Sequence, residues 1–175
     1  MTGAAITIPT LQTKRFTLRA PRRSDIEAYT AFRTSERARG VGGPYPAHET
    51  HDKLCAIVGH WLIEGFGRWV VADPKDNPLG IVGLMYPDSW PEPEIAWSVF
   101  ADAEGKGVAF EAAQAARSYA YHTLGWTTAV SCVMPDNTRS RALAQRLGAR
   151  READFDHPEY GILQVWRHPG PEALS

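Results

Sequence analysis

The stretch Glu94-Ile95-Ala96-Trp97-Ser98-Val99-Phe100 and the later turn Glu104-Gly105-Lys106-Gly107-Val108-Ala109 decide the fold of this chain. The first part has the apolar composition of a strand, and the second opens an alanine-rich helical pattern that runs to Leu124. The first N–H groups of a helix have no intrahelical partner and lie at the positive end of its dipole. Because glycine lets the main chain approach an anion closely, this order predicts a phosphate or pyrophosphate site at residues 105–109.

Two common nucleotide-binding motifs do not fit this turn. A dinucleotide fingerprint requires a third glycine at position 110, which is Phe110. A Walker-type loop requires Ser or Thr directly after Gly-Lys, but Gly107 follows Lys106. For a lone Gly-x-Gly, a structural turn that caps a helix remains the simpler alternative.

The composition is that of an ordinary globular domain. The chain is long enough for one domain with a core, and we expect residues 1–175 to form it. A net charge of −1 argues against nucleic acid as a partner, and no apolar run is long enough to span a membrane. The segment 1–10 is too polar and short for a signal peptide. Cys55 and Cys132 show no metal-ligand spacing, which predicts buried free thiols and a cytoplasmic protein.

Charge is unevenly distributed along the chain. Eight Lys or Arg and three Asp or Glu fall between Lys14 and Arg39. No basic residue lies between Lys75 and Lys106, but six acidic residues do. Such separation is usual for solvated surface, and it also suits a cationic substrate beside a phosphorylated one.

Hydrophobic periodicity and turn residues predict alternating strands and helices. We expect strands at residues 15–20, 68–72, 79–86, 94–100, 126–133, 150–155 and 162–167, and helices at 24–37, 51–63, 108–124 and 138–147. A capping box from Ser24 to Glu27 is expected to start the first helix, and Gly125 to end the third. Residues 1–10 are expected to form a loose tail or an edge, and the segment from Pro169 onward a tail.

This order and three local patterns resemble the GNAT acetyltransferases, over nearly the whole chain. Glu104, Gly107 and Ala109 occupy the defined positions of the family's Gln/Arg-x-x-Gly-x-Gly/Ala motif, with Glu104 as a departure. Residues 15–19 with Asp25, residues 94–99, and residues 137–140 with 147–149 resemble the branch that includes the ribosomal-protein N-terminal acetyltransferases. The resemblance implies a mixed α+β fold, with a mostly antiparallel, twisted sheet of six or seven strands and helices on both faces.

The resemblance also implies acyl transfer from acetyl-CoA, a co-substrate, to an amine. The expected acetyl-CoA contacts are Trp97, Val99, Glu104, Gly105, Lys106, Gly107, Val108, Ala109, Asn137 and Ser140. The pyrophosphate is expected at the glycine turn, where Lys106 would add positive charge and Glu104 a negative one. The pantetheine arm is expected to pair with strand 94–100, with the Val99 N–H donating to the thioester carbonyl. Trp69, Trp97 and Trp166 fall in expected strands, which favours core positions.

Glu94 is the expected general base. At pH 7 the neutral form of a lysine-like amine costs about 4.6 kcal/mol, and that of an N-terminal amine about 1 kcal/mol. A buried carboxylate on the acetyl-CoA strand would have a raised pKa suited to removing this proton. The alternative is a plain strand-edge carboxylate. Glu92 and Asp88, in the preceding loop, are weaker candidates that would act through water.

Ser140 is the expected partner of the leaving thiolate. Many family members use a tyrosine in this helix, but residues 137–147 contain none. The resemblance places Ser140 at that role, either as an acid or as a group that orients the sulfur. A first-turn serine that only bonds to the local backbone is an equal alternative. Asn137 is a plausible N-cap for the helix and by resemblance contacts pantetheine.

The acceptor is expected to be a primary amine, either a protein N-terminus or a small cationic molecule. Trp90 and the loop 40–45 are expected near the acceptor, with a plain connector as the alternative for the loop. His48, His51 and His60 lack a ligand pattern, so no metal is expected. A catalytically weak acyl-CoA sensor, or a transferase that uses another donor such as succinyl-CoA, remains an alternative. We expect a monomer or a homodimer.

Overall fold

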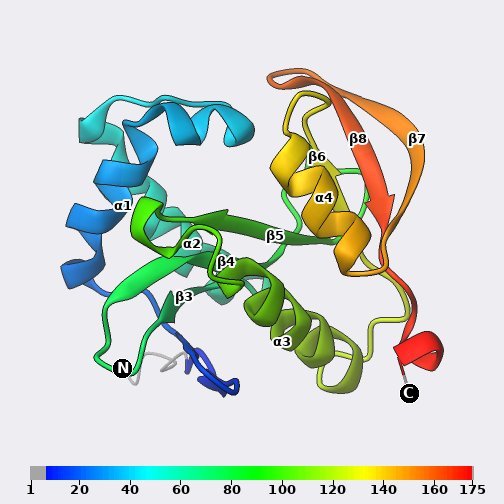
Figure 1. Cartoon of the computed structure of the whole chain (residues 1–175), viewed down its shortest axis with the longest axis horizontal. Coiled ribbons are helices and arrows are strands. Elements are labelled where there is room, and N and C mark those ends of the chain that lie inside the picture. The colour runs from blue at the N-terminus through cyan, green and yellow to red at the C-terminus, as the bar shows by residue number, and fades with distance from the viewer. Residues whose placement is uncertain (1–6, 175) are drawn as a thin grey trace.

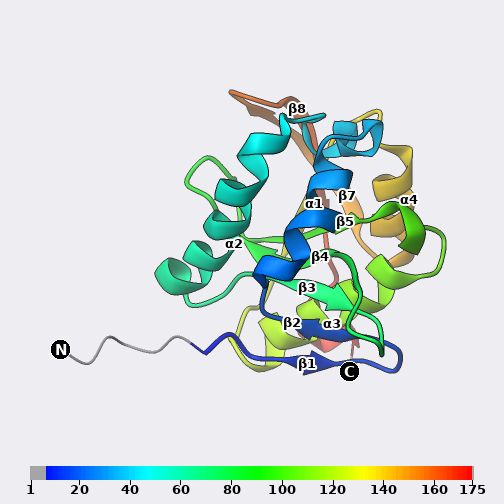
Figure 2. The same cartoon turned by 90° about the vertical axis from the view of Figure 1, so that its left-hand side faces the viewer.

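A computed structural model describes residues 7–174 of the chain. Its centre is one sheet of eight strands in the order β1-β2-β3-β4-β5-β6-β8-β7. Every neighbouring pair is antiparallel except β5 and β6. Figure 2 shows β1 to β5 stacked in this order from the bottom of the molecule. The mostly antiparallel α+β fold is confirmed, with one strand more than expected.

The strands are β1 Leu11–Gln12, β2 Thr17–Arg19, β3 Arg68–Ala72, β4 Pro78–Met85, β5 Glu94–Val99, β6 Val130–Val133, β7 Arg150–His157 and β8 Gly161–Arg167. The α-helices are α1 Ile26–Arg33, α2 Thr50–Glu64, α3 Val108–His122 and α4 Thr138–Arg146. Short 3-10 helices lie at Arg23–Asp25, Glu36–Val41, Ala47–Glu49, Ala101–Ala103 and Pro171–Leu174. None of the described helices is both long and apolar enough to cross a membrane.

The start of the described part of the chain lies at an edge of the sheet. Residues 1–6 lie outside the described part, but Leu11 pairs with Leu18 as an edge strand. The indole of Trp69 also donates a 2.7 Å hydrogen bond to the carbonyl of Pro9. A strand of two residues is too short to show in a periodicity pattern, because it depends on its neighbour for hydrogen bonds.

The first helix was predicted with the wrong cap and the wrong length. Asp25, not Ser24, caps this turn, because its carboxylate accepts the Arg22 N–H at 2.7 Å. The same carboxylate binds the guanidinium of Arg19 through two 2.9 Å bonds. The helix ends at Arg33, and a 3-10 helix takes over at Glu36.

Two other boundaries also needed correction. Strand β6 begins at Val130 rather than Trp126, whose ring packs edge-on against Phe66 with centroids 5.0 Å apart. Helix α3 ends at His122, two residues before the expected end, and Gly125 follows in the left-handed region at φ 72°. At the C-terminus, a short 3-10 helix at residues 171–174 lies within the expected tail.

Helices cover both faces of the sheet. On one face, Tyr29 and Phe32 of α1 and Ile57 of α2 pack with Val70 and Ile81. On the other face, the alanines of α3 pack in one cluster with buried residues of β2 to β5: Leu18, Trp69, Val71, Val82, Leu84 and Ile95. Small alanine side chains let the helix approach the sheet closely, which brings the N-terminus of α3 to the end of β5.

The sheet splits between β5 and β6, and this split positions the site. The two strands pair only at Glu94 and Val130 and diverge beyond that point. Figure 1 shows β6, β7, β8 and α4 on one side of the molecule and β3, β4, α1 and α2 on the other. The expected splayed end of the strand 94–100 is confirmed.

Candidate active site

The N-terminus of α3 opens into a groove between the two halves of the sheet. Gly107 is the N-cap at φ 76°, and Gly105 also lies in the left-handed region at φ 73°. No side chain caps this end among residues 7–174, and the N–H groups of Val108 and Ala109 are left for a ligand. A Cβ at Gly105 would meet no atom within 4 Å, so the turn is open to the groove. These features fit an anion.

The groove brings together the expected acetyl-CoA contacts, apart from Lys106. The contacts that line it are Trp97, Val99, Glu104, Gly105, Gly107, Val108, Ala109, Asn137 and Ser140. The exposed residue Lys106 does not line it, and its carbonyl accepts a 2.9 Å bond from Arg15. The positive charge near the turn therefore comes from other residues.

Three arginines supply that charge. Arg37, Arg139 and Arg146 all line the groove, and none of them was among the expected acetyl-CoA contacts. Arg37 and Arg139 both form ion pairs with Glu104, and Arg146 lies over the ring of Phe110 at 4.1 Å. With three cations against one carboxylate, the groove stays positive, which offsets the negative charge that Glu104 brings. The arginines come from a 3-10 helix and from α4, so only folding places them beside the turn.

The free edge of β5 forms the next part of the groove. The Phe100 N–H donates to Leu79 of β4 at 2.9 Å, so strand alternation directs the Val99 N–H to the opposite edge. The same alternation directs the main-chain groups of Trp97 to that edge. Beyond Glu94, β6 does not pair with them. Both residues therefore offer main-chain hydrogen-bonding groups to a ligand in the groove.

Ser140 lies where the groove meets a second cavity. Its Oγ accepts a 3.1 Å bond from the indole N–H of Trp97, and its own N–H donates to the Asn137 side chain at 3.1 Å. Because an indole N–H is only a donor, the hydroxyl hydrogen of Ser140 remains free to donate elsewhere. Asn137 is the N-cap of α4, as its residue type indicated. Trp97, Ser98, Asn137 and Ser140 line both the groove and the second cavity.

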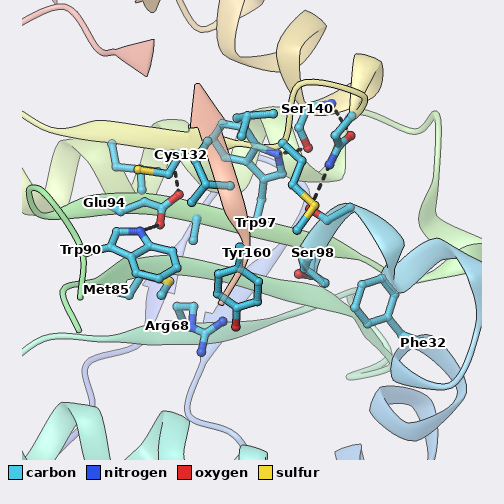
Figure 3. A pocket seen from close by; sticks show the side chains of 18 of the residues that line it. Phe32, Arg68, Met85, Trp90, Glu94, Trp97, Ser98, Cys132, Ser140 and Tyr160 are labelled. Carbon is cyan, nitrogen blue, oxygen red and sulfur yellow. Dashed lines mark hydrogen bonds between the residues drawn. The ribbon is translucent and has the colours of Figure 1, made fainter. Parts of the chain in front are cut away.

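Glu94 lies in the wall of this second cavity. Its Oε1 accepts the Cys132 N–H at 2.8 Å, and its Oε2 accepts the indole N–H of Trp90 (Figure 3). The side chain is buried, and this loss of solvation raises its pKa from 4.5 to about 7, against the two hydrogen bonds and the charge of Arg68, which lower it. A carboxyl with a pKa near 7 can take up a proton and release it again at neutral pH.

An aromatic cluster forms the wall next to Glu94. The ring of Trp90 lies 4.8 Å from His157 and 5.9 Å from Tyr160, centroid to centroid. The His157 Nδ1 accepts main-chain N–H groups of Glu159 and Tyr160, so its other nitrogen carries the proton and donates to Ser89 Oγ at 3.0 Å. Tyr160 and His157 come from the β7–β8 hairpin, and no sequence pattern indicates that the hairpin reaches this cavity.

The loop 40–45 also reaches the cavity, which Gly40, Val41 and Tyr45 help to line. Tyr45 donates a 2.6 Å hydrogen bond to the carbonyl of Val41, which closes the loop on itself. Burial raises the pKa of Tyr45, so its hydroxyl stays neutral. The loop therefore forms part of the site and is more than a connector.

Two other acidic residues of the segment 76–104, Glu92 and Asp76, are bound to arginines. Glu92 accepts two bonds from Arg167, at 2.6 and 2.8 Å, and this ion pair lowers its pKa. Asp76 binds Arg19 and Arg22 in the same way. Glu94 is the only carboxylate that lines the second cavity among residues 7–174. Apart from Glu94, the acidic residues of the segment 76–104 therefore do not line this cavity, and Glu92 is not suited to act as a base.

Cysteine and histidine side chains form no metal site within residues 7–174, where no cluster of metal-ligating residues occurs. The two cysteines are free, as expected, but Cys55 is exposed on α2 rather than buried. Cys132 is partly buried beside Glu94, and burial raises the pKa of its thiol. His60 bonds to the carbonyl of Phe66 at 2.8 Å and accepts the Tyr86 N–H at 3.1 Å, a structural role.

The chain matches a family of known proteins. A family model for the GNAT acetyltransferase domain matches residues 15–150. A crystal structure of an acetyltransferase from Agrobacterium tumefaciens str. C58 is 34% identical, covers 96% of this chain and 98% of its own, and has a TM-score of 0.85. The chain belongs to the GNAT acetyltransferase family. It is therefore an acyl-CoA-dependent transferase whose acceptors are amines.

More distant structures share the fold of this GNAT protein. A putative ribosomal-protein-serine acetyltransferase from Vibrio cholerae is 20% identical, with 90% of this chain and 95% of that chain covered and a TM-score of 0.75. RimL, a ribosomal L7/L12 alpha-N-protein acetyltransferase in complex with coenzyme A, is 15% identical, with 92% and 98% covered and a TM-score of 0.73. At such identities the likeness is one of fold alone.

Proposed function

We propose that this protein transfers the acetyl group of acetyl-CoA to a primary amine by direct attack, with Glu94 as the general base. One observation carries the proposal: the positive groove and the cavity that holds Glu94 meet at Trp97, Ser98 and Ser140. A thioester held along the groove and an amine held in the cavity would react at this junction. Holding two reactants in this way converts a bimolecular step into an effectively unimolecular one.

The groove residues would bind and orient acetyl-CoA. The N–H groups at the start of α3 and the arginines 37, 139 and 146 fit its phosphates. The open edge of β5 fits the amide groups of its pantetheine arm. The Val99 N–H is the candidate donor to the thioester oxygen, a contact typically worth about 3 kcal/mol of barrier.

In the proposed reaction, the amine nitrogen forms a bond to the thioester carbon, and the carbon–sulfur bond breaks. Glu94 takes the proton of the amine, either directly or through one water. The sulfur leaves as a thiolate, and the free hydroxyl hydrogen of Ser140 is positioned to donate to it. A free thiol has a pKa near 8.5, so a hydrogen bond suffices and a strong acid is not required.

Two measurements test this proposal. Calorimetry should give tight acetyl-CoA binding, with succinyl-CoA and free CoA as comparisons of donor preference. A thiol assay should then detect CoA release when N-terminal peptides, polyamines and small amines are added. Ser140→Ala should lower kcat more than it changes acetyl-CoA affinity. Binding without CoA release across the whole panel would contradict turnover and favour a sensor, and weaker binding of acetyl-CoA than of succinyl-CoA would reassign the donor.

The acceptor class within the amines has separate support from distant relatives. One solved relative is named for ribosomal L7/L12 N-terminal acetylation, and another, from Vibrio cholerae and a human counterpart, is a spermidine N-acetyltransferase chimera. A protein N-terminus and a small amine are thus both represented on this fold. The charges of the acceptor cavity discriminate between such acceptors more directly.

A further inference from the structure

The charged side chains of the acceptor cavity are mostly cationic. Arg33, Lys53 and Arg68 line it together with the single carboxylate of Glu94. This is the opposite of what a polycation acceptor requires. Of the acidic residues that suggested such an acceptor from the sequence, Asp76, Glu92 and Glu104 are bound to arginines, and only Glu94 lines this cavity among residues 7–174.

Arg33 is the most unusual of these cations. It is the last residue of α1, and its side chain is only 5% exposed. Its Nε and Nη2 atoms are buried without a hydrogen-bond partner in the described part of the chain. The half-exposed Glu49 forms an ion pair with Nη2 at 3.7 Å, a separation too long for a hydrogen bond. A buried guanidinium whose N–H groups lack hydrogen-bond partners is costly, so an anion that accepted hydrogen bonds from it would be stabilised there.

The surroundings of Arg33 hold its guanidinium in place. Its central carbon lies 4.1 Å from the ring centroid of Tyr45 and 5.7 Å from that of Tyr29. Stacking on two rings fixes the plane of the guanidinium without using its N–H groups. The fork of donors therefore stays available, in a geometry that suits a carboxylate.

Lys53 and Arg68 add to the positive charge, and the charge of Arg68 also acts on Glu94, whose pKa it lowers. Neither forms an ion pair or a side-chain hydrogen bond with another residue among positions 7–174. Figure 3 shows Arg68 below Tyr160, in the same cavity as Trp90 and Glu94. Arg33 contacts Tyr29 and Tyr45, whereas Glu94 contacts Trp90 and Cys132, so the arginine and the base share no direct neighbour.

We propose that the Arg33 end of this cavity binds a carboxylate of the acceptor, which is therefore an amine that carries an acidic group several bonds from its nitrogen. The inference rests on the proposed function, in which the nitrogen lies near Glu94. A small amino acid with a remote carboxylate and a peptide N-terminus followed by an acidic side chain share this chemistry. A polyamine lacks it, and its charges would be repelled by the three cations.

The test compares acceptors that differ only in the carboxylate. The small pair is 6-aminohexanoate and its amide, and the peptide pair is Ala-Glu-Ala-amide and Ala-Gln-Ala-amide. We expect kcat/KM to be at least tenfold higher for the acid than for the amide in one of the two pairs. That pair then shows whether the acceptor is a small amino acid or a peptide N-terminus. An equal or higher kcat/KM for both amides would overturn the proposal, while leaving amine acetylation itself established.

Variants of the cavity show whether Arg33 is responsible. Arg33→Gln should lower the preference for the acid to near one. Arg68→Gln should reduce the preference for the acid by several fold. It replaces Arg33→Gln as the test if circular dichroism shows that Arg33→Gln is unfolded. Arg150→Gln, at an exposed residue on β7, is the matched control and should change nothing. An unchanged preference in folded Arg33→Gln and Arg68→Gln would overturn the assignment.

A binding measurement keeps this inference separate from turnover. Hexanoate has the carboxylate of the small acceptor and no amine, so it cannot react. Calorimetric titration should show it binding to the wild-type protein and binding at least fivefold more weakly to Arg33→Gln or Arg68→Gln. Hexanoate binding with no acetylation of any amine would retain the carboxylate site and refute the proposed function. No hexanoate binding to the wild-type protein, together with no preference in either acceptor pair, would refute the carboxylate site.

Discussion

Replacing Glu94 with glutamine should change the pH dependence of stability by an amount set by its burial. In the folded protein its pKa is raised from 4.5 to about 7, so the folded state prefers the protonated carboxyl. This preference stabilises the wild-type protein fully below pH 4.5, and the contribution is lost as the pH rises through 7. For these two pKa values, the loss between pH 5 and pH 8 amounts to about 2.5 kcal/mol.

Glutamine cannot ionise, so Glu94→Gln should lack this loss. The variant loses at least one of the hydrogen bonds from Trp90 and the Cys132 N–H, because its amide nitrogen cannot accept, but that cost is the same at each pH and cancels in the comparison. Urea unfolding at pH 5 and at pH 8 should therefore show the variant gaining about 2.5 kcal/mol relative to wild type over this interval. A constant difference at the two pH values would refute the raised pKa, and with it the physical basis for Glu94 as a base near neutrality.

The same variant has a kinetic signature. In the wild-type protein, kcat/KM should rise with pH through about 7 as Glu94 ionises, and Glu94→Gln should lose this dependence and roughly 10²- to 10⁴-fold of the rate. Glu92→Gln is the matched control, because Arg167 lowers the pKa of Glu92 and its ionisation is complete at lower pH. A Glu92→Gln variant as slow as Glu94→Gln would contradict the assignment.

Three further substitutions test the groove and the core. Gly107→Trp should weaken acetyl-CoA binding at least tenfold in calorimetry, whereas Gly65→Trp, at another glycine of positive φ with open space around it, should not. Glu104→Gln should strengthen acetyl-CoA binding several fold at low salt, because it removes the one negative charge from a groove with three arginines. Weaker binding would mean that the main role of Glu104 is to hold those arginines in position. Leu84→Ala should lower the free energy of unfolding by about 3 kcal/mol in urea titration, against less than about 0.5 kcal/mol for Leu62→Ala on the exposed side of α2; equal losses would contradict the core assignment.

Strong local patterns allowed the central part of the fold to be predicted. The strand 68–72 was predicted with its observed ends, and the strand 94–100, the long helix and the last hairpin were within a few residues. Such segments carry several consecutive residues with one clear period, so the prediction averages over many side chains. The cap at Ser24 failed because Asp25 bonds to Arg19, which is a contact between separate elements.

The turn at residues 104–109 and the strand before it also located the groove for the phosphorylated substrate. Backbone N–H groups at a helix start need only the local order of strand, glycine and helix, which the sequence contains. Val99 faces the open edge of β5 for the same reason, since alternation along a strand is local. The arginines that make the groove positive come from residues 37, 139 and 146, which are far apart in the chain.

By itself, then, the sequence determined the order of elements, the glycine turn, and the presence of Glu94 on the strand that leads to it. Only the tertiary structure decided which charges face the acceptor. Glu92 and Asp76 form ion pairs with arginines of distant segments. Arg33, from the basic first third of the chain, lines the cavity. Charge counted along a chain ignores such pairing, because ion pairs and burial depend on distances in space that only packing sets.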